Sequence, residues 1–204
     1  MIQTIFYDRL FPTLIQIQDN ILVDDVRLSI LSDIQNKKKN EEFKQWQSKA
    51  NLHNEKLYSE LTDTILKSTK YYFDNMQYVY EDYEITDMWA NVYEKGEMHR
   101  THGHSNNMLS GVFYVSSIDA HPGITFLDPR PAVDVLVPTI KNYNTDNSSL
   151  WQYNATQNRL MLFPSWLKHY VPVNETDTNR VSISFNVMFR GKLGSSDDYS
   201  SGNF

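Results

Sequence analysis

The sequence predicts a mainly β domain with helices ahead of it, arranged as an antiparallel barrel or jelly roll. Two helix-like apolar stripes occur between residues 20 and 80, after which the pattern changes to the two-residue alternation of strands. With the early segment 11–17, seven or more short strand-like segments are expected, and no helix-length stripe interrupts those that follow residue 84. Helices followed by a run of strands favour antiparallel sheets with the helices packed outside.

The first elements expected are an edge strand and a helix. Residues 11–17 (FPTLIQI) alternate and start beside a proline, which suits an edge strand. A helix follows, because apolar residues recur every four positions from Leu22 to Ile34. Asp24 and Asp25 lie near the start of that helix and three lysines at 37–39 follow its end, as the helix dipole favours.

A second helix is predicted over residues 56–76, with an apolar stripe that we assign to core packing: Leu57, Leu61, Ile65, Tyr72 and Met76. The strands expected next cover residues 88–93, 109–115, 124–127, 159–163, 169–173 and 180–189. Residues 138–158 are rich in Asn, Thr, Ser and Asp and predict a long loop or lid.

The 204 residues suffice for one domain over 1–190, with a helical part at 20–80 and a jelly-roll part at 84–190. The tail 191–204 is low in complexity and is expected to be mobile. No basic leader, and no apolar run that could span a membrane, is present, so we expect a cytoplasmic protein without a membrane partner. The net charge of −6 argues against nucleic acid as the main partner.

The chain has no cysteine, so any metal site must use His, Asp, Glu or other oxygen ligands. His102 and His104 are two residues apart; on a strand they would face the same side, about 7 Å apart, and could share a metal ion. His169 is the candidate for a third ligand. Nitrogen-rich sites of this kind suit iron, zinc, copper or nickel.

The segment 180–189 is the cleanest strand in the sequence, with Val181 and Ile183 on one face and Arg180 and Ser182 on the other. The polar face must meet either water or a hydrated pocket. An arginine with a serine two residues later offers a seat for a carboxylate, because the guanidinium can donate two parallel hydrogen bonds and the hydroxyl a third.

The order of these segments closely resembles a family of 2-oxoglutarate- and Fe(II)-dependent oxygenases. The resemblance is carried by His-x-His, LSGVFYV, GITFLDPR, RLMLFPSWLKHYV and NRVSISFN, and is strongest from Trp89 to Asn186. It implies the double-stranded β-helix fold of prolyl hydroxylases. It also implies a non-haem iron dioxygenase that couples decarboxylation of 2-oxoglutarate to succinate and CO2 with hydroxylation of a substrate. Dioxygen and a small-molecule or peptidyl substrate would be the partners.

The resemblance assigns roles residue by residue. His102 and His169 match iron ligands, Arg180 matches the arginine that binds the far carboxylate of 2-oxoglutarate, and Ser182 its helper. Tyr114 lies where related enzymes often place a tyrosine that hydrogen-bonds the same carboxylate.

The sequence departs from the superfamily pattern at His104, where most members have Asp or Glu. Either the site has three histidines, which we favour, or a carboxylate comes from elsewhere, with Asp128 as the candidate. A cupin-like three-histidine enzyme without 2-oxoglutarate is an alternative, although Arg180 would then have no function. A non-catalytic jelly-roll binding or structural protein is the other alternative.

Overall fold

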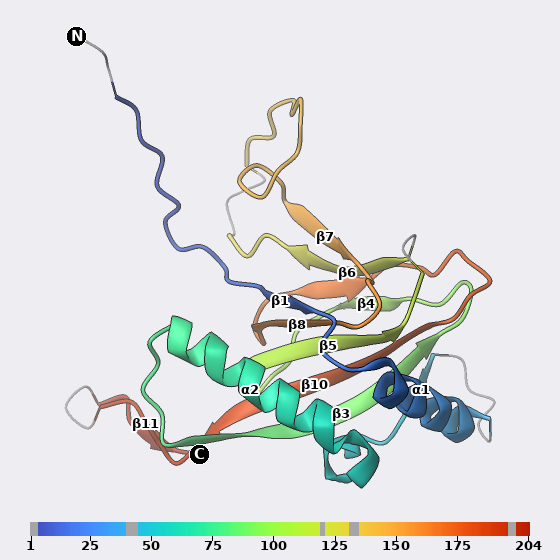
Figure 1. Cartoon of the computed structure of the whole chain (residues 1–204). Coiled ribbons are helices and arrows are strands. Elements are labelled where there is room, and N and C mark those ends of the chain that lie inside the picture. The colour runs from blue at the N-terminus through green and yellow to red at the C-terminus, as the bar shows by residue number, and fades with distance from the viewer. Residues whose placement is uncertain (1–3, 40–44, 119–120, 131–134, 196–198) are drawn as a thin grey trace.

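In the computed structural model the strands form two facing antiparallel sheets, and both helices cover the outer face of the larger one (Figure 1), which confirms the predicted fold class. The structure describes residues 4–39, 45–118, 121–130, 135–195 and 199–204. In chain order the elements are β1 (Gln16–Asp19), α1 (Asp24–Lys38), β2 (Trp46–Gln47), two 3-10 turns (Leu52–Asn54 and Lys56–Tyr58), α2 (Ser59–Asn75), β3 (Asp82–Tyr93), β4 (His99–His102), β5 (Leu109–Ser116), β6 (Pro122–Leu127), β7 (Leu150–Asn154), β8 (Arg159–Pro164), β9 (His169–Val171), β10 (Arg180–Arg190), β11 (Lys192–Leu193) and β12 (Gly202–Asn203).

The larger sheet has six strands in the order β1-β8-β5-β10-β3-β2, and the smaller has four in the order β4-β9-β6-β7. All these strand pairs are antiparallel, as expected for strands joined by turns. Neither described helix is long and apolar enough to cross a membrane.

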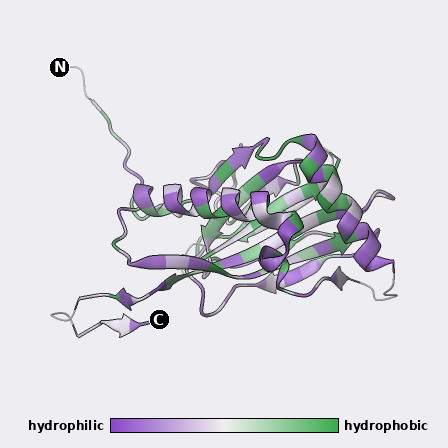
Figure 2. Cartoon of the chain, turned by 60° about the horizontal axis from the view of Figure 1, so that its bottom comes forward, coloured by the Kyte–Doolittle hydropathy of each residue, from purple (hydrophilic) through white to green (hydrophobic). Residues whose placement is uncertain are grey.

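Strand β10 lies between β5 and β3 in the larger sheet, and the two faces of this sheet pack against different cores. Its apolar residues, from Val181 to Val187, pack in the core beneath the helices together with Ile30 and Phe73. A second, smaller core lies on the inner face of the sheet and includes Phe126 and Phe163. Figure 2 shows purple, white and green segments alternating along both the helices and the strands, as expected for elements with one polar and one apolar face.

Several boundaries differ from the sequence prediction. The first strand begins at Gln16, not Phe11, because its pairing with β8 starts there. Residues 138–158 are not one loop, since residues 150–154 pair with β6 as strand β7. That strand was missed because it is a half-exposed edge strand whose alternation is weak in the sequence.

The tail also contains structure that the sequence did not indicate. Strands β11 and β12 pair with each other, and Gly191 and Phe204 exchange backbone hydrogen bonds. The histidine pair was expected on one strand, but β4 ends at His102 and His104 lies in the loop beyond it.

Gly111 on β5 is required by close packing. A Cβ at this position would lie 2.2 Å from the Phe185 ring and 2.6 Å from the Met161 carbonyl oxygen. Gly111→Ala should therefore lower the free energy of unfolding by about 1–3 kcal/mol, the usual cost of overpacking a core. Urea denaturation monitored by circular dichroism measures this. Gly103→Ala is the matched control, since its Cβ would meet no atom closer than 3.4 Å. An unchanged midpoint for Gly111→Ala would contradict the packing described.

Candidate metal centre

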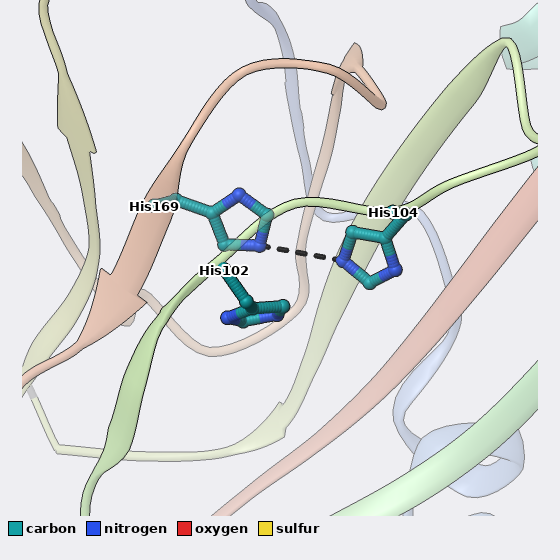
Figure 3. A group of neighbouring side chains, drawn as sticks. All are labelled: His102, His104 and His169. Atoms are coloured by element: carbon teal, nitrogen blue, oxygen red, sulfur yellow. Dashed lines mark hydrogen bonds between the residues drawn. The ribbon is translucent and has the colours of Figure 1, made fainter.

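Three histidines from two distant segments of the chain lie together between the sheets. His102 is the last residue of β4 and pairs in register with His169, the first residue of β9. His104 approaches from the loop after β4. Figure 3 shows the three rings gathered around one point, with a dashed line joining His104 to His169.

The ring nitrogens of this group are close enough to share one metal ion. One ligand atom from each histidine lies within 4.8 Å of the other two. The Nε2 atoms of His104 and His169 are 3.4 Å apart. Among the described residues this is the one group of three or more potential ligands with such spacing.

Backbone carbonyls fix the orientation of two of the rings. His102 Nδ1 lies 2.8 Å from the Arg100 carbonyl oxygen, and His169 Nδ1 lies 2.8 Å from that of Leu167. A carbonyl oxygen only accepts, so each Nδ1 carries the proton and donates. Each Nε2 therefore keeps its lone pair for a metal, the usual arrangement of metal-binding histidines.

Burial keeps these imidazoles neutral at neutral pH. Desolvation is the largest cause that lowers the pKa of His169 to about 3 and that of His104 to about 4, and neighbouring imidazoles lower both further. The pKa of His102 is also lowered, mainly by burial. The rings of Phe126 and Phe163 lie against His169, with centroids 5.9 and 4.9 Å away, and exclude water from it. Neutral imidazole is the form that binds metals.

Arg180, the first residue of β10, is a buried cation in the same cavity. It is 1% exposed, and its terminal nitrogens donate to the carbonyl oxygens of Pro122 and Pro172. Its guanidinium lies 5.0 Å from the centre of the Tyr93 ring. Its Nε has no hydrogen-bond partner, and Arg180 forms no ion pair within the described ranges. Burial lowers its pKa.

Ser182 and Tyr114 face each other on paired strands and line the cavity that joins Arg180 to the three histidines. Tyr114 is buried, and desolvation raises the pKa of its hydroxyl. The six side chains expected at a metal and cofactor site are thus brought into one cavity.

Asp128, the alternative carboxylate ligand, is outside this group. It follows β6, and its carboxylate forms an ion pair with Arg130, which is the largest cause of its lowered pKa. His99 also lines the cavity, with its ring centre 4.4 Å from that of His102.

One wall of the cavity, formed by β2 and β3, was not apparent from the sequence. Trp89 lies 6.1 Å from the His104 ring between centroids. Gln47 donates to Asn91, which in turn donates to Ser184, so a row of polar side chains crosses three strands. The alternation of residues 88–93 indicated that these side chains share a face, but not that this face is the inner one.

The donor set suits a divalent transition metal. Three neutral imidazoles supply nitrogen ligands of the type that iron, nickel, copper and zinc accept. They add no negative charge, so a bound divalent ion would keep its full charge until an anionic ligand joined it. The buried, carboxylate-free Arg180 in the same cavity is a second feature that favours an anionic ligand.

Comparison with known proteins gives a family match and several similar folds. Residues 87–186 match the model of the family described as "Putative 2OG-Fe(II) oxygenase". No curated protein sequence matches the chain.

Solved structures share the fold at low sequence identity. A prolyl-4-hydroxylase from Pseudomonas putida is 14% identical, with a TM-score of 0.61 over 88% of this chain and 89% of the other. HygX from Streptomyces hygroscopicus, with nickel and 2-oxoglutarate bound, is 10% identical, with a TM-score of 0.63 over 94% and 91%. The viral collagen prolyl hydroxylase of Paramecium bursaria Chlorella virus 1, in a 2-oxoglutarate complex, is 12% identical, with a TM-score of 0.54 over 85% and 94%.

His104→Ala should weaken the binding of Ni(II), measured by anaerobic calorimetry, by more than roughly 10- to 100-fold, which is the cost of losing a residue that only orients a ligand. The matched control is His99→Ala, because His99 is beside the group but not part of it. Equal affinities for wild type and His104→Ala would contradict a three-histidine site.

Proposed function

We propose, on the premise that the chain belongs to the 2OG-Fe(II) oxygenase family, that His102, His104 and His169 hold the iron and that Arg180 anchors 2-oxoglutarate. The family and the fold are those of non-haem-iron oxygenases that depend on 2-oxoglutarate. When bound, the iron would activate dioxygen, the oxidant of the reaction, and 2-oxoglutarate would supply two electrons as it is converted to succinate and CO2. One oxygen atom would enter succinate and the other the hydroxylated substrate. The substrate that we propose to be hydroxylated is a small molecule or a peptidyl side chain.

The observation that carries this proposal is the buried guanidinium of Arg180. Burying a cation away from water is costly unless an anion or several hydrogen bonds compensate it. Two backbone carbonyls and the face of Tyr93 compensate part of the charge, while Nε remains without a partner. A carboxylate entering the cavity would complete the compensation, with the hydroxyls of Ser182 and Tyr114 nearby.

The two ends of 2-oxoglutarate suit the two kinds of group that line the cavity. One end is a 2-keto acid, which can bind a metal through two oxygens, and the other is a simple carboxylate. The cavity is lined both by the three histidines and by Arg180. Three neutral imidazoles leave the charge of Fe(II) unchanged, so the dianion would offset the charge of the iron and leave the single positive charge of Arg180. Ligation by His104 therefore fits a dianionic cofactor without help from Asp128.

The residues of the chain would orient the reactants and exclude water. Phe126 and Phe163 cover one side of His169, and Trp89 lies near His104. These rings would keep the reacting centre dry. The polar row formed by Gln47, Asn91 and Ser184 would be left to contact substrate, because neither the metal nor 2-oxoglutarate uses it.

Residues 138–149, the part of the predicted loop that precedes β7, are proposed as a lid over the site. Their length and polar composition support this, since long loops without strands or helices often close over active sites.

Arg180→Met should weaken 2-oxoglutarate binding by roughly 10- to 100-fold, since a hydrogen bond to a charged group contributes about 1.5–3 kcal/mol. Anaerobic titration of the Fe(II)-loaded protein with 2-oxoglutarate, followed by the visible charge-transfer band, measures this. Arg159→Met is the matched control, because Arg159 pairs with Asp19 outside the cavity. An equal dissociation constant for Arg180→Met and wild type would contradict the proposed anchor.

The same titration of the wild type tests the alternative functions. Iron binding without any charge-transfer band would favour the cupin-like reaction, and no iron binding would favour a non-catalytic protein.

Deletion of residues 138–148 should abolish coupled oxidation of substrate while Fe(II) and 2-oxoglutarate still bind, because the ligands and Arg180 lie outside the loop. The measurement is the amount of hydroxylated product formed per succinate, with any substrate that supports turnover in the wild type. Unchanged coupling in the deletion variant would rule out the lid.

A further inference from the structure

One turn of the chain supports two of the three histidines. The turn connects β8 to β9 and includes Ser165 and Leu167. The backbone N–H of His104 donates to the Ser165 carbonyl oxygen at 2.9 Å. The ring Nδ1 of His169 donates to the Leu167 carbonyl oxygen at 2.8 Å. The spacing of His104 and His169 therefore depends on where this turn lies.

The turn is held in place by a chain of buried side-chain hydrogen bonds. Ser165 Oγ lies 2.8 Å from Ser110 Oγ, and Ser110 Oγ lies 2.8 Å from Asn186 Oδ1. These residues are 0%, 1% and 6% exposed. An amide oxygen only accepts, so Ser110 gives its single proton to Asn186, and Ser165 must donate to Ser110. The direction of both bonds is thus fixed.

This chain of bonds ends on the centre of the larger sheet. Ser110 on β5 and Asn186 on β10 are direct partners in the strand register. The backbone is tied at the same place, because Ser165 N–H donates to the Met108 carbonyl and Met108 N–H to that of Val187. The turn is therefore joined to β5 and β10, two inner strands of the larger sheet that are each paired on both sides and so are held rigidly.

We propose that Ser110, Ser165 and Asn186 are positioning residues for the metal centre. None of them is among the potential ligands, and they act through the turn that holds His104 and His169 at the spacing a metal needs. This inference rests on the proposed function. It also gives the polar face of β10 two tasks, with Arg180 at one end for the cofactor and Asn186 at the other for the metal ligands.

The alternative is that these hydrogen bonds serve stability alone. Buried hydroxyl and amide groups need partners wherever they occur, so any such cluster contributes to folding. The two views differ in what happens to metal binding when the cluster is cut. A stability role leaves the metal affinity of the folded protein unchanged, whereas a positioning role lowers it and alters the ligand geometry.

The test compares Ni(II) affinity in the full chain by calorimetry, with Cu(II) electron paramagnetic resonance to count coordinated nitrogens. Ser165→Ala, Ser110→Ala and Asn186→Leu should each bind Ni(II) about 10- to 100-fold more weakly, the range for losing a residue that orients a ligand. Their copper spectra should change in nitrogen splitting. Asn186→Asp, which keeps the acceptor oxygen for Ser110, should remain close to wild type.

Ser68→Ala is the matched control. Ser68 is 1% exposed and donates to Gln18 at 2.6 Å. The Ser68→Ala variant therefore loses a comparable buried hydrogen bond, at a position outside the cavity and far from the histidines in the sequence. Its Ni(II) affinity should equal that of wild type. If Asn186→Leu does not fold, the two serine variants decide the matter.

Wild-type affinity and copper spectra in both serine variants would overturn the positioning role, as would an equal loss of affinity in Ser68→Ala. If His104→Ala binds Ni(II) as tightly as wild type, the proposed three-histidine metal centre would be wrong, and the positioning role would be wrong with it.

Discussion

Strand β10 lies between β5 and β3, and each of its side chains must face either the helices or the second sheet. Its apolar residues fill the core beneath α1 and α2. Its polar residues consequently project into the space between the sheets. There they line a cavity or join a buried hydrogen-bond network, and they do not face bulk solvent. The two-residue period of one strand thus sets both the main core and the chemistry of the site.

The charges in the cavity follow from this arrangement. Arg180 is the permanently charged group among the described residues that line it, and burial keeps the nearby imidazoles neutral. A site with one buried cation and space for a divalent metal is strongly positive, and it favours a dianion over a neutral ligand. In the proposed site, the three histidines and Arg180 would act together, because both favour a dianionic cofactor over a neutral one.

Much of this was predictable from the sequence because it depends on local periodicity. The faces of β10 and the helical stripe with Leu61 and Ile65 could be read directly, and the residues proposed for the metal and cofactor do share a cavity. Long-range packing decided the rest. Pairing of β4 with β9 brings His102 to His169, and no local pattern shows that pairing. His104 lies off the strand because its backbone bonds to Ser165, a contact across 61 positions of sequence (165 − 104). The inner orientation of Trp89 likewise depends on the second sheet.

The central claim is that three histidines hold the metal and that Arg180 holds the far carboxylate of 2-oxoglutarate in the same cavity. The most direct measurement is a crystal structure of the protein grown anaerobically with Fe(II) and 2-oxoglutarate. We expect Nε2 of His102, His104 and His169 to bind the iron. The keto-acid end of 2-oxoglutarate should bind the same iron, and its other carboxylate should contact the Arg180 guanidinium. A carboxylate oxygen from Asp128 on the iron in place of His104, or a cofactor carboxylate bound away from Arg180, would contradict it.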